Sequence, residues 1–302
     1  MSSWFNPQSP KPVQYQALPD TQRYKLTLAY RGTRYHGWQR QIPAAGDELP
    51  TVQNEVRLAL TRTLGHDVQV VGSSRTDAGV HALGQVAHFD TIRTQIASER
   101  ILLAANAKLP DDIRIDAIEP VPDTFDAIGS TVEKAYRYVI HNAPLKDIFR
   151  ADLALHMPKP LDLPAMQEAA RHLVGEHDFA SFVKPGHGRD TTVRTVSEAS
   201  VRAENDDVVV EFAGGGFLWH QVRIMTGTLI QVGLGRREAA TIPEVLAARD
   251  RKASGPTAPA HGLYLLWIRS RDEPAPEAAG AAVVETTPSR TPETLSVRKT
   301  HP

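Results

Sequence analysis

Residues 71–90, VGSSRTDAGVHALGQVAHFD, place one carboxylate, that of Asp77, in a short polar turn between two strand-like segments. Arg75 lies just before this acid and Gly79 just after it. Glycine adopts backbone angles that a residue with a Cβ avoids, so Gly79 suits a sharp turn or the close approach of a ligand. The turn could present an acid and a guanidinium to a substrate, or it could be an Asx-turn in which Asp77 caps its own backbone. Taken alone, the turn favours the structural interpretation.

A second candidate is the loop RGTRYHGWQRQ, residues 31–41, which interleaves basic and aromatic residues. Arginines bind phosphate and flat rings stack on bases, so this composition fits a nucleic-acid surface. The candidate RNA-binding residues are Arg31, Arg34, Trp38 and Arg40. In the alternative interpretation, Tyr35 and Trp38 anchor the core and the arginines are only solvated. The sequence leaves both interpretations open.

Metal and thiol chemistry receive little support from the sequence. Asp77, His81 and His88 could form a metal set, but their spacing is not the i, i+4 pair of a metal-binding helix, so we predict no metal site. The chain has no cysteine, which excludes a thiol nucleophile, a disulfide scaffold and a Cys-ligated zinc site.

Composition limits the remaining classes. The 302 residues suffice for one large domain or two smaller ones. The net charge is −1, so any site for a polyanion must be a local patch rather than a global field. The polar, Pro-rich N-terminus lacks the apolar core of a signal peptide, and no apolar run approaches the ~18 residues of a membrane span. These features predict a cytoplasmic protein with no membrane partner.

Hydrophobic periodicity predicts strands that alternate with helices. The predicted strands are 25–30, 67–72, 85–89, 111–121, 134–142, 195–204, 206–214 and 261–269. Helices are expected to start after the N-cap residues Thr51, Asp162 and Thr241, and two further helices near Ser98 and Phe217. Gly65 and Gly175 are expected to end helices. This order indicates an α/β or α+β domain with helices on one sheet face.

The chain divides into four predicted segments. These are a disordered leader over 1–22, an α/β half over 23–130 that carries the Asp77 turn, a second α/β half over 131–270 and a disordered tail over 271–302. The tail is rich in Pro, Ala, Glu and Thr, a composition that buries too little apolar surface to fold.

Six segments occur in the order and at about the spacing of the bacterial tRNA pseudouridine synthase A family. They are YRGTRYHGWQRQ, RTDAGVHALGQVAHF, AYRYVI, GEHDFASF, FLWHQVRIMTGTLIQVG and GLYL. The chain resembles this family over residues 24–268. The RTDAGVHA element is long and specific, and six ordered segments carry more weight than a lone short motif.

The resemblance implies a fold, an activity and partners. The fold is two ferredoxin-like halves that share an extended mixed, mainly antiparallel sheet, with helices on one face and an active-site cleft between the halves. The activity is isomerisation of uridine to pseudouridine at positions 38–40 of the tRNA anticodon stem–loop, without cofactor or metal. The family also works as a homodimer, with tRNA lying across both subunits.

The resemblance also implies roles for individual residues. Asp77 matches the catalytic aspartate, and Arg223 matches the arginine that pairs with it. Tyr136 matches the tyrosine that stacks on the target base, and stacking would offset part of the few kcal/mol needed to extrude a base. Leu263 matches an apolar residue of the uracil pocket, and Arg75 matches an arginine that helps to hold the flipped-out nucleotide.

Several alternatives stay open at this stage. Asp77 could attack C1′, attack C6 or act as a base. Ile128 stands where the family often has an arginine, and the loop after Trp38 is longer than usual, which bears on RNA affinity more than on chemistry. The alternative function is a non-catalytic tRNA-binding protein or chaperone on the same scaffold, and a metal-dependent hydrolase that uses Asp77 is a third.

Overall fold

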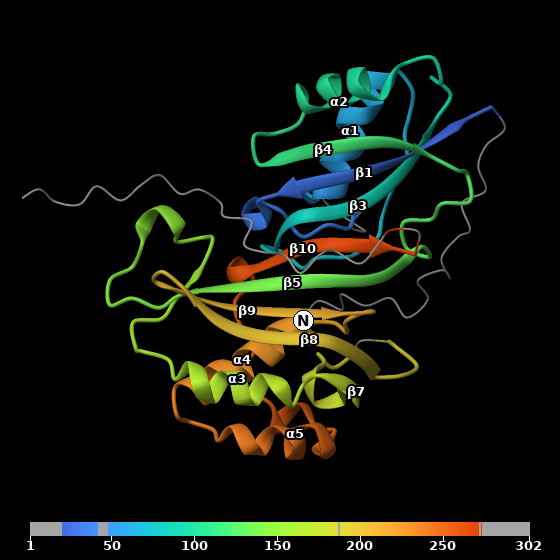
Figure 1. Ribbon diagram of the computed structural model, residues 1–302. Coiled ribbons are helices and arrows are strands. Elements are labelled where there is room, and N and C mark those ends of the chain that lie inside the picture. Colours follow the sequence, from blue (N-terminus) through green and yellow to red (C-terminus); the bar gives the residue numbers. More distant parts are fainter. Residues whose placement is uncertain (1–19, 42–47, 187, 272, 274–302) are drawn as a thin grey trace, which may run out of the picture.

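The structure is a computed structural model that describes residues 20–41, 48–186, 188–271 and 273, and its centre is one mixed sheet of ten strands (Figure 1). The strands are β1 Gln22–Tyr30, β2 Val70–Gly72, β3 His81–Thr91, β4 Ile113–Val121, β5 Thr131–His141, β6 Leu155–His156, β7 Gly175–Asp178, β8 Val193–Glu204, β9 Asp207–Gly214 and β10 Leu263–Ser270. Their order is β4-β1-β3-β10-β5-β9-β8-β7, with β2 beside β3 and β6 beside β5. Only the β10–β3 and β5–β6 pairs among the described strands are parallel, which confirms the predicted mixed α/β fold.

The described residues form five α-helices, which lie near the two ends of this sheet. They are α1 Val52–Leu64, α2 Ser98–Asn106, α3 Leu163–Arg171, α4 Gln221–Gly233 and α5 Ile242–Ala248. Figure 1 shows α1 and α2 at the β4 end of the sheet and α3, α4 and α5 at the β8–β7 end. Short 3-10 turns cover Gly32–Arg34, Ile148–Arg150, Ala180–Phe182, Ala239–Thr241, Arg251–Ala253 and Ala260–Gly262.

The alternation in β1 explains how the strand joins the core. Leu26, Leu28 and Tyr30 share one face of the strand and are buried, while the residues between them are partly exposed. A strand with one covered face and one wetter face shows this period of two. The pattern agrees with helices that cover one face of the sheet.

Helix ends follow the sequence signals in part. Gly65 adopts the left-handed conformation at the end of α1, with φ 74°, and the Asp162 carboxylate accepts a hydrogen bond from the backbone N–H of Ala165 at the start of α3. Thr51 precedes α1, but its hydroxyl makes no capping bond. Helix α3 ends at Arg171, and Gly175 is instead the first residue of β7, so the prediction that Gly175 ends this helix is wrong.

Strand β10 joins the two ends of the sheet. It pairs antiparallel with β5 and parallel with β3, where Tyr264 lies opposite His81 and Leu265 opposite Ala82. The last strand in sequence therefore lies in the middle of the sheet. Its first residue, Leu263, comes next to the segment that follows the Asp77 turn.

The predicted division of the chain stays a prediction, although β5 begins at Thr131, next to the expected boundary. Most of the predicted leader and tail lies outside the described residues, and β1 already includes Gln22. No helix in the described part of the chain is long and apolar enough to cross a membrane.

Candidate active site

The turn that carries Asp77 is fixed from both sides by hydrogen bonds. The backbone N–H of Ser73 donates to Val86 O at 2.8 Å, and Gln85 Nε2 donates to Ser74 O at 2.7 Å. At the other end, the Val80 N–H donates to Asp77 O at 3.1 Å. The backbone of Asp77 is therefore held before any substrate arrives, as a preorganised site requires.

The loop of residues 32–38 supports this turn through its backbone. The Trp38 N–H donates to Thr76 O at 3.1 Å, and the Gly79 N–H donates to Tyr35 O at 3.3 Å. Gly37 has φ 89°, and a Cβ there would lie 2.4 Å from Thr76 O. Only glycine allows the loop to approach the turn so closely.

Trp38 is a core residue, which corrects its assignment to an RNA-binding surface. The side chain is 1% exposed, and its ring stacks on Tyr30 with centroids 6.1 Å apart. Gly72 leaves room for the indole, because a Cβ at that position would lie 2.2 Å from Trp38 Nε1. Tyr35 is also buried. Of the two interpretations of the loop, burial favours the one in which these rings anchor the core.

The Asp77 carboxylate contacts helix α4. Its Oδ2 atom accepts a hydrogen bond from Arg223 NH1 at 2.9 Å and lies 3.2 Å from His220 Nε2. The side chains of Asp77, Arg223 and His220 are 25%, 14% and 16% exposed. The Asx-turn interpretation does not describe this carboxylate, since Oδ2 contacts Arg223 on α4 and His220 just before α4.

The segment that contains Ala258 holds Arg223 by a second contact. Arg223 Nε donates to Ala258 O at 2.8 Å, and the Ala258 N–H donates to Arg223 O at 3.0 Å. Gly227 lets this segment approach, because a Cβ there would lie 1.8 Å from Pro256 O. Arg223 is thus not a solvated cation on the helix surface.

Tyr136 belongs to a hydroxyl network beside the turn. It is 7% exposed, its hydroxyl lies 2.9 Å from Ser74 Oγ, and its ring meets Phe217 edge-on. Burial raises the pKa of Tyr136 to about 12, so the phenol is neutral at neutral pH. Lys134 Nζ donates to Ser74 Oγ at 3.4 Å, and burial lowers the pKa of this amine to about 8.

The other predicted site residues lie in different settings. Leu263 is buried at the start of β10, and Arg75 is exposed in the turn. The arginines of the loop each have an acidic partner: Arg31 pairs with Asp152, Arg34 with Asp112 and Arg40 with Glu48. The structure therefore brings Asp77, Tyr136 and Arg223 into one region and leaves the loop arginines in exposed ion pairs.

His81 and His88 have structural roles, because each accepts a hydrogen bond from a backbone N–H group. Gly32 N–H donates to His81 Nδ1, and Ala127 N–H donates to His88 Nδ1. In the described part of the chain, no three His, Asp or Glu residues are grouped as metal ligands.

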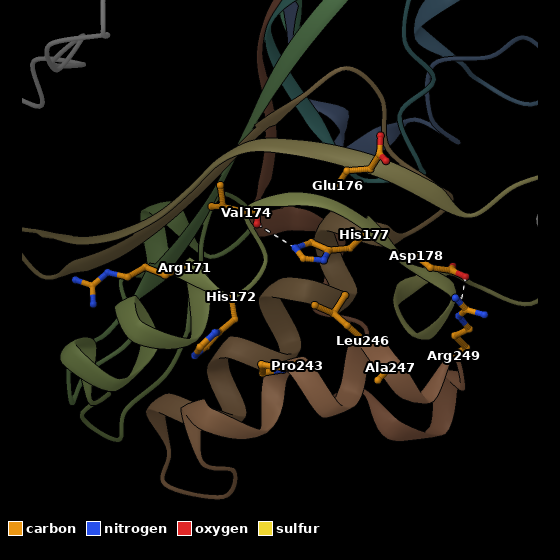
Figure 2. Close-up of a pocket in the computed structure, with 10 residues that line it drawn as sticks. All are labelled: Arg171, His172, Val174, Glu176, His177, Asp178, Pro243, Leu246, Ala247 and Arg249. Carbon is orange, nitrogen blue, oxygen red and sulfur yellow. Dashed lines mark hydrogen bonds and ion pairs between the residues drawn. The ribbon is translucent and has the colours of Figure 1, made fainter.

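A pocket of 780 Å³ lies elsewhere, between α3, β7 and α5 (Figure 2). Some of its polar groups pair with one another: His177 Nε2 lies 2.9 Å from Val174 O, and Arg249 pairs with Asp178 at 3.0 Å. None of the predicted site residues lines this pocket. We place the site at Asp77 because that region has a fixed carboxylate with buried partners.

His220 was missed by sequence reasoning. It lies three residues before Arg223 in the segment HQVR, but it precedes α4 in a left-handed conformation, so helical spacing does not place it beside Asp77.

The fold and the site together define a mixed α/β protein with an arginine-paired aspartate in a fixed turn. The sequence profile of the tRNA pseudouridine synthase family matches residues 27–128 and 169–269. The first match includes Asp77, the second includes Arg223 and Leu263, and Tyr136 lies between them.

Relatives agree with the profile. The chain is 47% identical over 243 residues to tRNA pseudouridine synthase A of Brevibacillus brevis, covering 80% of this chain and 97% of that protein. It is 44% identical to tRNA pseudouridine synthase A of Ruminiclostridium cellulolyticum, with 82% and 98% covered, and 43% identical to that of Acetivibrio thermocellus, with 81% and 98% covered. The chain therefore belongs to the tRNA pseudouridine synthase family, whose members are isomerases that act on tRNA.

Proposed function

We propose that this protein converts uridine to pseudouridine at positions 38–40 of the tRNA anticodon stem–loop, with Asp77 as the catalytic carboxylate. The observation that carries the proposal is the 2.9 Å contact between Asp77 and Arg223, which are 146 residues apart in sequence. Burial and a specific charge partner are typical of functional carboxylates.

The chemistry needs a carboxylate that is ionised and fixed. The reaction breaks the N1–C1′ bond, turns the uracil and joins it to C1′ through C5; C5 then loses its proton and N1 gains one, so that the product is an isomer of uridine. Asp77 acts as the nucleophile on C1′ or C6, or as the base that starts an elimination. Each route uses the carboxylate of Asp77, and the hydrogen bond from Arg223 NH1 fixes its Oδ2 atom.

The uridine reaches this carboxylate after it leaves the base stack, because atoms inside a duplex are inaccessible. Tyr136 offers its ring to the extruded base, and Leu263 contributes apolar surface to the pocket. Arg75 is exposed beside Asp77 and supplies a cation for the nucleotide's phosphate. The burial of Tyr136 and Leu263 supports a pocket that excludes water.

The test uses unmodified anticodon stem–loops and maps pseudouridine after incubation with the purified protein. Wild-type protein modifies positions 38–40, whereas Asp77→Asn and Asp77→Ala form no pseudouridine and still bind RNA. Asp116→Asn is the control, because it removes a carboxylate of an exposed ion pair with Arg114 on β4. Wild-type turnover by Asp77→Asn would remove Asp77 from the mechanism, and RNA binding without turnover by the wild type would favour the non-catalytic alternative.

We also propose that the protein works as a homodimer, as the family resemblance implies. Support comes from a group of apolar side chains exposed between β5 and β6. Leu145, Ile148 and Phe149 are 83%, 73% and 87% exposed, and exposed apolar groups mark interaction sites. Sedimentation should show a dimer for the wild type and a monomer for Ile148→Ser/Phe149→Ser; a monomeric wild type would contradict the proposal.

A further inference from the structure

Lys25 and Lys134 are the two lysines in the described part of the chain that are half-buried rather than exposed. Lys25 lies on β1 and pairs with two carboxylates, those of Glu119 and Glu273. Lys134 lies on β5 and makes no ion pair within the described residues; its one hydrogen bond there runs from Nζ to Ser74 Oγ at 3.4 Å. An ammonium group has three donors, so most of the hydrogen-bonding capacity of Lys134 is unused.

A half-buried ammonium without a carboxylate is unfavourable, because burial removes water from the charge. Burial, reinforced by the guanidinium of Arg189, lowers the pKa of Lys134 to about 8. The amine therefore still carries its proton for most of the time at neutral pH. Perturbed groups of this kind are typical of functional sites, where a ligand completes their surroundings.

Lys134 lies beside the Asp77 turn. Its hydrogen-bond partner Ser74 precedes Asp77 by three residues, and Ser74 Oγ also lies 2.9 Å from the hydroxyl of Tyr136. Lys134 and Tyr136 are two residues apart on β5, so their side chains leave the same face of the strand. The ammonium group is thus at the edge of the region that contains Asp77 and Tyr136.

The groups that surround Lys134 are neutral or cationic. Strands β9 and β10 place Gly214 and Ile268 opposite it in register. The phenol of Tyr136 is neutral, because burial raises its pKa to about 12. The loop between β7 and β8 contributes the positive charge of Arg189. An anion that approaches Lys134 therefore meets no acid among these neighbours.

The anion that accompanies the proposed substrate is a phosphodiester. A uridine that leaves the base stack to reach Asp77 brings its sugar and the phosphates on either side of it. The Asp77 carboxylate is already bound by Arg223, at 2.9 Å, and so does not need Lys134 as its counter-ion. A lysine ammonium binds phosphate as a point charge and positions the backbone of a nucleic acid.

We propose that Lys134 binds a phosphate next to the extruded uridine, with Ser74 holding the ammonium group in place and Arg189 adding a second positive charge. The inference rests on the proposed function, in which Asp77 acts on an extruded uridine. It gives the two residues on this face of β5 different parts of the nucleotide: Lys134 binds the backbone and Tyr136 the base.

The experiment compares variants that keep or remove the charge. Lys134→Met retains an unbranched side chain without the charge, and Lys134→Arg stays charged at every pH used. Lys108→Met is the matched control, because Lys108 is exposed just after α2 and donates to Ala104 O. Binding to an unmodified anticodon stem–loop is measured in the Asp77→Asn background, so that the uridine stays intact. The kcat and the melting temperature are measured with Asp77 present.

We expect Lys134→Met to weaken binding roughly 10-fold, the scale of a hydrogen bond to a charged group, and to reduce the salt slope by about 0.7–0.9. The kcat at saturating RNA should stay within about threefold, because the contact is the same before and during the reaction. Lys108→Met should match the protein with both lysines intact.

The pH dependence of binding gives a second readout. With Lys134 present, affinity should fall from about pH 7 to about pH 9 as the ammonium loses its proton. Lys134→Arg should keep its affinity over this range, and Lys134→Met should be weak throughout. The same fall in all three proteins would show that another group titrates, and it would overturn the inference.

A neutral methylphosphonate, placed at one phosphate of the stem–loop at a time, identifies the partner of Lys134. Replacing a phosphate that flanks the target uridine should weaken binding by about 10-fold when Lys134 is present and cause no further loss in Lys134→Met. If every replacement weakens both proteins equally, Lys134 contacts no phosphate and the inference fails.

The remaining outcomes separate this inference from the proposed function. A purely structural role would change the melting temperature of Lys134→Met and leave its affinity and salt slope unchanged, which would overturn the inference. A fall in kcat without a loss of affinity would place Lys134 in the chemistry and would also overturn it. If Asp77→Asn is inactive while Lys134→Met binds like its parent, the phosphate role fails and the role of Asp77 stands. If Asp77→Asn forms pseudouridine, the proposed function fails, and the methylphosphonate comparison still decides the role of Lys134.

Discussion

The Asp77 turn and the loop of residues 31–40 use the same kinds of residue in different ways. Arg223 and Asp77 form an ion pair with side chains 14% and 25% exposed, whereas in the loop pair Arg31 and Asp152 are 55% and 40% exposed. Removing one partner of a buried pair is expensive, while an exposed pair contributes about 0–1 kcal/mol. The less exposed Asp77–Arg223 pair therefore holds α4 against the Asp77 turn, whereas the more exposed Arg31 is accessible to a ligand such as RNA.

The buried and the exposed residues of the loop have different roles. Gly37 packs closely against the Asp77 turn, and the backbone N–H of Trp38 donates a hydrogen bond to Thr76 O in that turn. Its arginines stay at the surface. A single motif thus contributes framework to the Asp77 turn and cations to the proposed RNA side, so variants of the two groups of residues should fail differently.

The largest effect is expected where the buried pair is broken. Arg223→Met removes the hydrogen-bond donor to Asp77 Oδ2 from a partly buried pair, and the cost of about 3–5 kcal/mol for breaking a fully buried pair is the upper limit. We expect kcat on an anticodon stem–loop to fall by at least about 100-fold. Arg223→Lys keeps the charge without the planar guanidinium, so its kcat should be intermediate. A kcat of Arg223→Met close to that of the wild type would show that the pair is only structural.

The next effect concerns stability. Trp38→Ala should lower the free energy of unfolding by about 3–5 kcal/mol, the range for truncating a buried tryptophan. Urea unfolding measures this, with the exposed neighbour His36→Ala as the control. If Trp38 stacked on RNA instead, the variant would keep its stability and lose tRNA affinity.

The sequence predicted secondary-structure elements better than it predicted which side chains contact one another. Strand β1 and helix α1 follow from local periodicity and the Gly65 end signal. The burial of Trp38 does not, because YHGW suits either a surface or a core, and the choice depends on Gly72 and Tyr30, which are distant in sequence.

The candidate site shows the same limit. Arg223 reaches Asp77 only through the packing of α4 against the turn, so the family resemblance was needed to connect them. The apolar pattern that begins at Phe217 placed His220 inside a helix, but α4 begins at Gln221, and His220 turns towards Asp77 in a left-handed conformation. Periodicity reports which face is buried and does not report the conformation of a residue before the helix.

A smaller effect is expected on the pH dependence of stability. Burial lowers the pKa values of His220 and His88 to about 4, so both rings are neutral in the folded protein and take up protons on unfolding below about pH 6.5. The unfolded state then binds more protons, and the free energy of unfolding falls as the pH drops from about 6.5 to 4, by at most about 1.4 kcal/mol per pH unit and residue. His220→Asn should reduce this slope in urea unfolding at pH 7, 6 and 5. An unchanged slope would contradict a buried neutral His220.

The smallest effect is expected from the exposed arginines. Each phosphate contact adds about 0.7–0.9 to the slope of log K for RNA binding against log salt concentration. Arg31→Ala/Arg34→Ala should lower that slope by about 1–2 and leave kcat at saturating tRNA unchanged. Arg114→Ala is the matched control, because Arg114 forms an exposed pair with Asp116 on β4. An unchanged slope in the double variant would remove the loop from the RNA side.

The acidic partners sharpen this last test. Arg31 must release Asp152 before it can bind a phosphate, so part of its attraction for RNA is already used within the protein. Asp152→Asn should therefore strengthen tRNA binding at low salt, while Asp77→Asn abolishes turnover. Two substitutions of the same chemical type would then act on different steps, because one acid competes with the phosphate for a surface arginine and the other is anchored to α4.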